Sequence, residues 1–309
     1  MKLKTIAASL FCLASSFFPN CTFGGDSDTK AATAIQNSTP TPLDIFTLES
    51  TYTGASTVRP AFPTAQQNAV HTDFNFGRRF PVTGQWYLRL GVEYDRYDFG
   101  GSPSFLPQHL QGASAVIAYE YVIQGFAGAA IELHPGFYFE NDVTGNAFSV
   151  PIDLYSGFKI SGEKVFGMIG LSEGQFLSPA VTPIGGVIWL VDDKTRLEAI
   201  FPRPSLVHTL NDDWELRGVC DLHGFGFRTD SGPPAGVVQP PQDHRGSVVM
   251  YQFYQIGALV TYSHIKPFQV SVGAGYNIQR QFNFFRDDYE QKYKASGAPY
   301  VKVSVEADF

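Results

Sequence analysis

Two acid–histidine pairs are the residues whose types and spacing could do chemistry in this chain. Glu132 and His134 stand two positions apart, and so do Asp221 and His223. Side chains two positions apart on a β-strand share one face, so each carboxylate could orient its imidazole as a general base. The ordinary alternative is a satisfied network of buried polar groups. We therefore expect no catalytic residues here, although a serine within reach of either histidine would favour a hydrolase.

No other pattern of residues predicts a catalytic, cofactor-binding or metal site. The chain has no Gly-rich phosphate loop, no C-x-x-C, no H-E-x-x-H and no G-x-S-x-G, and its seven histidines are scattered. Three cysteines are too few for a disulfide scaffold. A net charge of −7 without a Lys/Arg cluster argues against a nucleic-acid partner. We expect no cofactor.

The first residues have the pattern of an export signal. Lys2 and Lys4 precede an apolar stretch from Ile6 to Phe18, which matches the charged and apolar regions of a signal peptide. We expect residues 1–21 to be this signal, with its cleavage site and a lipid anchor on Cys21 left open. Residues 22–43 are rich in Thr, Ser, Ala and Gly and predict a flexible N-terminal segment.

Most of the remaining chain alternates apolar and polar residues with a period of two. Between 85 and 95, Trp86, Leu88, Leu90 and Val92 alternate with a polar or small row. Successive side chains of a strand point to opposite faces, whereas a helix requires apolar spacings of three and four. The same alternation recurs at 148–160, 268–279 and 301–309. The body of the chain is therefore predicted to be all-β.

Four features favour a membrane barrel over a soluble sandwich. The strands are long, their polar rows contain few lysines, and aromatic residues gather near their ends. The chain also stops on Phe309, and a terminal aromatic on an amphipathic last strand resembles the signal that the barrel assembly machinery recognises. We predict a transmembrane antiparallel up-and-down β-barrel over residues 44–309.

Turn residues predict about fourteen strands. Pro202 and Pro204 lack the N–H that a ladder needs, so we divide residues 194–210 into two short strands. Twelve strands, with the first segment left outside, is the alternative. The predicted long loops are 55–67, 99–109, 140–146, 175–180, 230–245 and 286–298.

The polar faces of these strands predict which side chains line the lumen. The candidates are Arg89, Glu93, Asp95, Glu132, Asp153, Lys159, Arg217, Asp221, Gln255, Lys302 and Glu306. Several bulky residues fall on the same face: Tyr155, Phe225, Phe227, Tyr251 and Phe253. They could plug the pore or form an apolar slot, or a β-bulge could turn them to the other face.

A family likeness rests on two stretches of the sequence. The segment from Leu197 to Leu210, with Phe201-Pro202-Arg203-Pro204 and then Asn211-Asp212-Asp213-Trp214, resembles a stretch of an outer-membrane β-barrel family of unknown function. So do Pro135-Gly136-Phe137-Tyr138 and the strand containing Pro151. This resemblance implies a fold and a location in the bacterial outer membrane, and it brings no catalytic residues.

The function expected from these observations is a passive, porin-like channel for small solutes. Rings of charge in a lumen set the ion preference of such pores. A non-conducting structural or binding barrel, a lipid-modifying outer-membrane enzyme, and a soluble carbohydrate-binding β-sandwich remain as alternatives. The expected partners are outer-membrane lipid, the barrel assembly machinery and small solutes.

Overall fold

The computed structural model describes residues 44–59, 65–103, 105–122, 128–162, 164–174, 176–177, 179–230, 244–286 and 289–309. The predicted signal, the segment 22–43 and most of the predicted loop 230–245 lie outside this set. The strands are β1 (Asp44–Arg59), β2 (Ala65–Thr83), β3 (Trp86–Asp98), β4 (His109–Tyr121), β5 (Ala129–Leu133), β6 (Gly136–Phe139), β7 (Phe148–Ser149), β8 (Ile152–Ser161), β9 (Val165–Glu173), β10 (Val181–Leu190), β11 (Thr195–Phe201), β12 (Ser205–Asn211), β13 (Trp214–Arg228), β14 (Val248–Tyr262), β15 (Phe268–Arg286), β16 (Tyr289–Ala295) and β17 (Ala298–Asp308). A 3₁₀ turn covers Gly145–Ala147. In the described part of the chain, no helix is long and apolar enough to cross a membrane.

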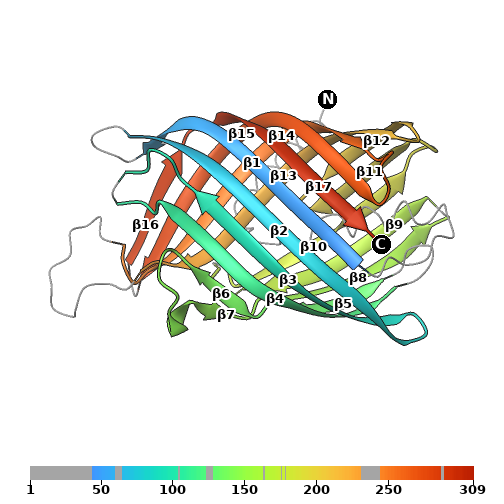
Figure 1. The fold of residues 1–309 in the computed structure, drawn as a ribbon, viewed down its shortest axis with the longest axis horizontal. Helices are drawn as coiled ribbons and strands as arrows, with labels where there is room; N and C mark the ends of the chain where they lie inside the picture. Colours follow the sequence, from blue (N-terminus) through green and yellow to red (C-terminus); the bar gives the residue numbers. More distant parts are fainter. Residues whose placement is uncertain are drawn as a thin grey trace, which may run out of the picture.

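The strands form one closed antiparallel barrel (Figure 1). Closure comes from β1, which pairs with β2 on one side and with β17 on the other. Three barrel strands are interrupted, and each of them carries two labels: β5 and β6, β7 and β8, and β16 and β17. Counted as whole strands, the seventeen labelled segments make a barrel of fourteen strands. The predicted fold and strand number are confirmed. The twelve-strand alternative is wrong, because β1 is hydrogen-bonded along both edges.

The division of residues 194–210 is also confirmed. β11 ends at Phe201 and β12 begins at Ser205, and the two pair antiparallel through Glu198↔Ser205. Neither Pro202 nor Pro204 can donate a ladder hydrogen bond, so the chain reverses between them.

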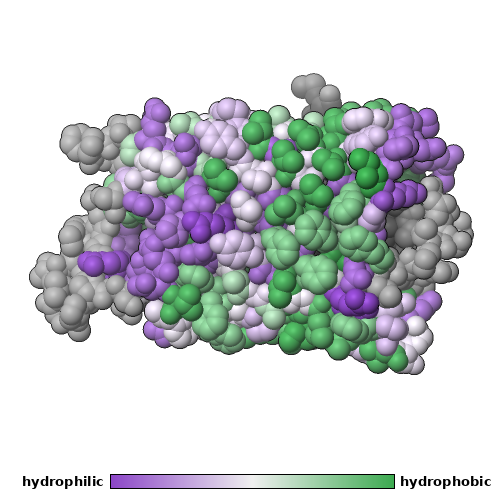
Figure 2. All heavy atoms as spheres, viewed as in Figure 1, coloured by the Kyte–Doolittle hydropathy of each residue, from purple (hydrophilic) through white to green (hydrophobic). Residues whose placement is uncertain are grey.

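Large apolar side chains of the strands point outward, away from the barrel interior. Leu48, Ile169 and Val272 are examples of large apolar residues that remain exposed, Val272 to 56%. Figure 2 shows that such side chains gather over the half of the barrel where the C-terminus lies in Figure 1. We call this band the apolar belt. Apolar side chains outside a single closed sheet make the soluble sandwich wrong.

The barrel is wide at one end and narrow at the other. Beyond Val219, β13 has no partner on β12, and at its tip Arg228 pairs in parallel with Phe139 of β6. The strands β8 to β12 end before this level and lie toward the right of Figure 1. We call the end that holds both Asp44 and Phe309 the wide half. The narrow half is built from β1, β2, β3, β4, β6, β13, β14, β15 and β16.

A close backbone approach joins the two halves at β13. A Cβ on Gly226 would lie 2.4 Å from the carbonyl oxygen of Phe176, so only glycine fits at this position. The guanidinium of Arg228 lies 5.8 Å from the centre of the Phe176 ring. Phe176, which follows β9 in the chain, therefore packs against the end of β13 that holds Gly226 and Arg228.

Aromatic side chains fill the narrow half from within. Phe227 and Tyr251 are almost fully buried there, and the two rings that join them on β15 are Phe282 and Phe284. We call this group, with its neighbours, the aromatic cluster. Its other members are Val58, Ala69, Tyr97, Phe99, Leu106, Leu110, Phe225, Val249, Phe253, Tyr293 and Ala295. One alternative left open by the sequence was that a β-bulge turns bulky residues such as Phe225 and Tyr251 to the outer face. This alternative is wrong, because the same positions of β13 and β14 face inward along the whole of each strand.

A β-bulge does occur, but on β15. Gln255 pairs with Asn277 and Tyr254 with Gln279, so Ile278 is the extra residue, and it is exposed. The extra residue exchanges the two faces of the strand beyond it. This exchange is what points Phe282 and Phe284 inward.

Two predicted loops are wrong for one physical reason. Within 286–298 lies β16, and within 55–67 lie the end of β1 and the start of β2. β16 buries Tyr293 and Ala295 and exposes Glu290, Lys292 and Lys294. Because these segments lie in the narrow half, their outward row is polar, and a search for apolar-outward strands reads them as loops.

Candidate functional site

A cavity of about 420 Å³ lies inside the wide half. Its lining extends from Thr47, Trp214 and Glu306 near the chain termini to Phe225 and Gly226 beside the aromatic cluster. This volume falls within the range of sites that bind small molecules, about 300–1,000 Å³. The cavity is the candidate functional site.

The predicted lumen residues divide into three groups. Six of them line the cavity: Glu93, Asp95, Asp153, Arg217, Lys302 and Glu306. Four are buried in the polar networks around it: Arg89, Glu132, Asp221 and Gln255. Lys159 is exposed and is not part of the lining.

Three carboxylates stand in register on the inner face of neighbouring strands. Glu49 of β1 is opposite Asp73 of β2, and Asp73 is opposite Asp95 of β3. Lys302 Nζ lies 2.6 Å from Glu49 Oε1, and His71 Nε2 lies 2.5 Å from Asp95 Oδ1. Like charges directly opposite one another destabilise a sheet, so this row needs the cations beside it.

The pair Glu132 and His134 belongs to a neighbouring network. His134 Nδ1 lies 2.9 Å from Glu93 Oε2, and its Nε2 lies 3.5 Å from Asp153 Oδ2 and 3.7 Å from Glu132 Oε2. Arg89 balances part of this charge, with an N–O distance of 2.7 Å to Glu132. Together, Glu49, Asp73, Glu93, Asp95 and Asp153 form what we call the acidic wall of the cavity.

The other predicted pair is held in a similar way. Asp221 Oδ1 lies 2.8 Å from His223 Nε2, and Arg203 Nη2 lies 3.1 Å from Asp221 Oδ2. The His223 ring stacks on Phe253 at 4.8 Å. Among the described residues, no hydrogen bond joins a serine to either His134 or His223.

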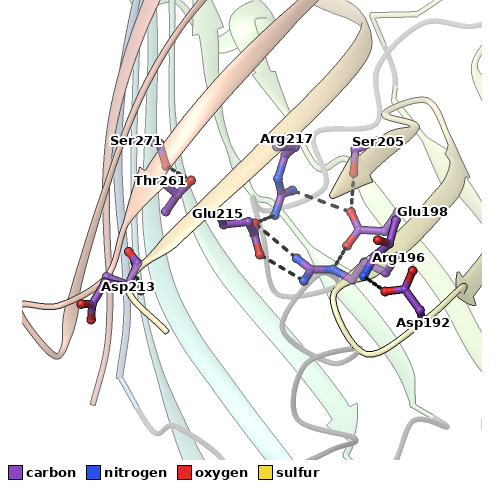
Figure 3. Close-up of polar contacts among 11 residues, drawn as sticks. Asp192, Arg196, Glu198, Ser205, Asp213, Glu215, Arg217, Thr261 and Ser271 are labelled. Atoms are coloured by element: carbon purple, nitrogen blue, oxygen red, sulfur yellow. Dashed lines mark hydrogen bonds and ion pairs between the residues drawn. The ribbon is translucent and has the colours of Figure 1, made fainter. Parts of the chain in front are cut away.

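A balanced network of charges faces the cavity from β11, β12 and β13 (Figure 3). Arg196 Nε donates to Glu198 at 2.6 Å, and its Nη1 donates to Glu215 at 3.1 Å. Arg217 Nη2 donates to Glu215 at 3.3 Å, and Ser205 Oγ donates to Glu198 at 2.5 Å. Two arginines and two glutamates leave this wall without net charge.

The cavity as a whole carries an excess of acid. Its lining contains ten Asp or Glu side chains and four Lys or Arg. A concave, negatively charged site in a low-dielectric wall raises the local concentration of cations. The lining therefore gives the cavity a negative electrostatic potential.

Sequence reasoning missed several of the lining side chains. Glu49 and Asp73 lie on predicted strands and line the cavity. Glu49 directly follows the outward residue Leu48 on β1, and Asp73 lies three positions before the outward residue Phe76 on β2. Their inward facing could be read from this alternation. The juxtaposition of Glu49, Asp73 and Asp95 could not, because it depends on the registers of β1, β2 and β3.

An acidic junction closes the rim of the narrow half. Asp230 accepts hydrogen bonds from the backbone N–H groups of Asn141 and Asp142, at 2.9 and 3.0 Å. The backbone N–H of Asp230 donates to Glu140 Oε2 at 3.3 Å. Burial, together with the charges of Asp230 and Asp142, raises the pKa of Glu140 to about 7.

Within the described ranges, no group of three or more His, Cys, Asp or Glu residues is arranged to hold a metal ion.

Comparisons with known proteins return solved structures only. No family model and no curated protein matches the chain. An outer-membrane channel from Pseudomonas putida F1 is similar over 88% of this chain and 97% of its own, with 12% identity and a TM-score of 0.47. The P. putida toluene transporter TodX is similar over 89% and 92%, with 10% identity and a TM-score of 0.38. The Ralstonia pickettii toluene transporter TbuX is similar over 87% and 90%, with 10% identity and a TM-score of 0.34.

Proposed function

We propose that this protein is a passive transport barrel for small solutes in a bacterial outer membrane. The observation that carries the proposal is a charged cavity inside a closed barrel whose outer surface bears an apolar belt. Acyl chains would cover the belt, since β-barrels cross membranes with apolar residues outward and polar residues in the lumen. Lipid is then the first partner, and the assembly machinery would read Phe309.

Transport through this barrel uses no cofactor and no catalytic step. The acid–histidine pairs support this part of the proposal, because their side chains neutralise one another in networks. Solutes enter the wide half and exchange their hydration for the carboxylates, amides and hydroxyls of the lining. The acid excess selects small cations and positively charged organic molecules.

A binding barrel without conductance is the second candidate. The aromatic cluster favours it, because buried rings such as Phe227, Tyr251 and Phe282 occupy the lumen of the narrow half. A close-packed aromatic core leaves no water path of its own. In that case the cavity would hold its ligand from the wide end alone.

Single-channel recording on the full chain, refolded in detergent and inserted into planar bilayers, separates the two candidates. We expect cation-selective steps whose reversal potential in a KCl gradient follows the acid excess of the lining. Absence of conductance from a correctly folded barrel would remove the channel and leave the binding barrel. Anion selectivity would contradict the role assigned to the acidic wall.

A further inference from the structure

The central carboxylate of the acidic wall has no cation of its own. Glu49 is held by Lys302 and Asp95 by His71, at 2.6 and 2.5 Å. Asp73 stands between them in register and, within the described residues, makes neither a hydrogen bond nor an ion pair. Three neighbouring carboxylates with only two cationic partners are costly to ionise together in the empty barrel. A positively charged ligand at Asp73 would offset this cost.

Some buried polar atoms along the same wall also lack a hydrogen-bond partner. Asp153 is only 9% exposed and His134 only 4%, yet Asp153 Oδ1 and His134 Nε2 have no hydrogen bond. Asp95 Oδ2 is in the same condition. All three side chains line the cavity. A carboxylate oxygen can only accept, so the open oxygens of this wall fit a ligand that brings several N–H donors.

Aromatic surface begins one row beyond the carboxylates. His71 lies two residues before Asp73 on β2, and its ring stacks on Tyr97 at 4.2 Å and lies 6.4 Å from Phe225. Phe225 also lines the cavity. The face of an aromatic ring attracts a cation and packs against another ring. Charge and aromatic surface therefore meet at one end of the cavity.

We propose that this end of the cavity binds a small organic ammonium ion that carries an aromatic or apolar group. Its ammonium group lies at Asp73, within reach of Asp95, and its apolar group lies against Phe225. The inference rests on the proposed function in taking the cavity as the place of the solute. It names the chemical class of that solute.

Isothermal titration calorimetry on the full chain in detergent tests the class directly at pH 7. The probe is benzylammonium chloride, compared with benzyl alcohol and sodium benzoate. We expect saturable binding of benzylammonium and at least tenfold weaker binding of the neutral and anionic analogues. Equal binding of benzyl alcohol or benzoate, or no binding of benzylammonium at millimolar concentration, overturns the proposal.

A matched pair of variants tests the position. Asp73→Asn removes the central charge with little change of volume, and we expect at least tenfold weaker binding of benzylammonium. Asp98→Asn removes the same charge from β3, at a side chain that pairs with Arg96 and lies outside the cavity lining. This control is expected to bind within twofold of the parent. Asp73→Asn binding as tightly as the control contradicts the assignment.

The outcome remains interpretable if the variant or the channel fails. Heat-modifiable gel mobility shows whether Asp73→Asn has folded, and the three probes test the parent protein without any substitution. Planar-bilayer conductance tests the proposed transport function separately. Binding without conductance keeps the ammonium site and removes the channel, whereas conductance without binding does the reverse.

Discussion

The wide and narrow halves of this barrel share several strands, such as β13, β14 and β15, but the two halves have opposite solvent preference. On β15, Val272 of the wide half is outward and exposed, while Phe282 of the narrow half is inward and fully buried. The wide half thus has an apolar outside and a polar cavity. The narrow half has an aromatic inside and a polar outside, as a soluble domain does (Figure 2).

The difference shows that an alternation with a period of two identifies a strand, but it does not tell whether lipid, water or protein lies on each side of that strand. Along β13 the inward row passes from Glu215 and Arg217 to Phe225 and Phe227 without any change of face. Only the surroundings on both sides of the sheet change. The apolar belt therefore marks the part of each strand that lipid would cover, and the aromatic cluster marks the part that stands above it.

The largest expected effect comes from removing a ring of the aromatic cluster. Phe282→Ala leaves a cavity in a packed core and should lower the free energy of unfolding by about 3–5 kcal/mol. Urea unfolding in detergent, followed by tryptophan fluorescence, measures this loss. Phe76→Ala is the matched control, because Phe76 is 39% exposed in the apolar belt. Equal losses in the two variants would contradict a packed narrow half.

A charge placed on the outer surface should destabilise the wide half more than the narrow half. Val272→Arg puts a guanidinium in the apolar belt, where the expected cost in a lipid bilayer is about 2–4 kcal/mol. Gln66→Arg puts the same group on an exposed position of β2 in the narrow half, where about 0.5 kcal/mol or less is expected. Refolding titrations into lipid vesicles measure both. The apolar belt would not face lipid if Val272→Arg were as well tolerated as Gln66→Arg.

The sequence predicted the strands of the barrel better than its ends. Pro202 and Pro204 marked the reversal between β11 and β12, because a missing N–H can be read from one residue. β16 was predicted as a loop, because its outward row of Glu290, Lys292 and Lys294 lacks the apolar face that identifies a membrane strand. Whether the outward face of a strand is apolar or polar depends on where the lipid-covered part of the barrel ends, and no single residue indicates that position.

The candidate site was predictable only in part for a similar reason. Inward-facing charges such as Glu93 and Lys302 followed from alternation. The row of Glu49, Asp73 and Asp95 required three strand registers, and the inward turn of Phe282 required a bulge at Ile278. Registers and bulges are set by packing between strands that are distant in sequence.

A smaller effect is expected at the terminus of the wide half. Phe309 exchanges backbone hydrogen bonds with Asp44 at 3.0 and 3.1 Å, and its ring meets Phe268 edge to face at 6.2 Å. Deleting Phe309 should lower the amount of assembled barrel in membranes several-fold, as measured by heat-modifiable gel mobility. Phe309→Tyr keeps the aromatic ring and should assemble normally. Normal assembly of the truncated chain would remove the terminal-signal role.

The smallest expected effect is a pH dependence confined to the rim of the narrow half. The pKa of Glu140 is raised to about 7 from its usual 4.5, so the folded protein binds this proton more tightly than the unfolded chain. The stabilisation that protonated Glu140 gives is complete below pH 4.5 and is lost as the pH rises through 7. Hydrogen exchange at the amides of Asn141 and Asp142, corrected for the intrinsic rate, should therefore accelerate modestly between pH 5 and 8. Glu140→Gln, which cannot ionise, should abolish this change while the aromatic cluster stays equally protected in both proteins. A pH effect that persists in Glu140→Gln, or that spreads to Phe282 and its neighbours, would show that the rim and the core of the narrow half open together.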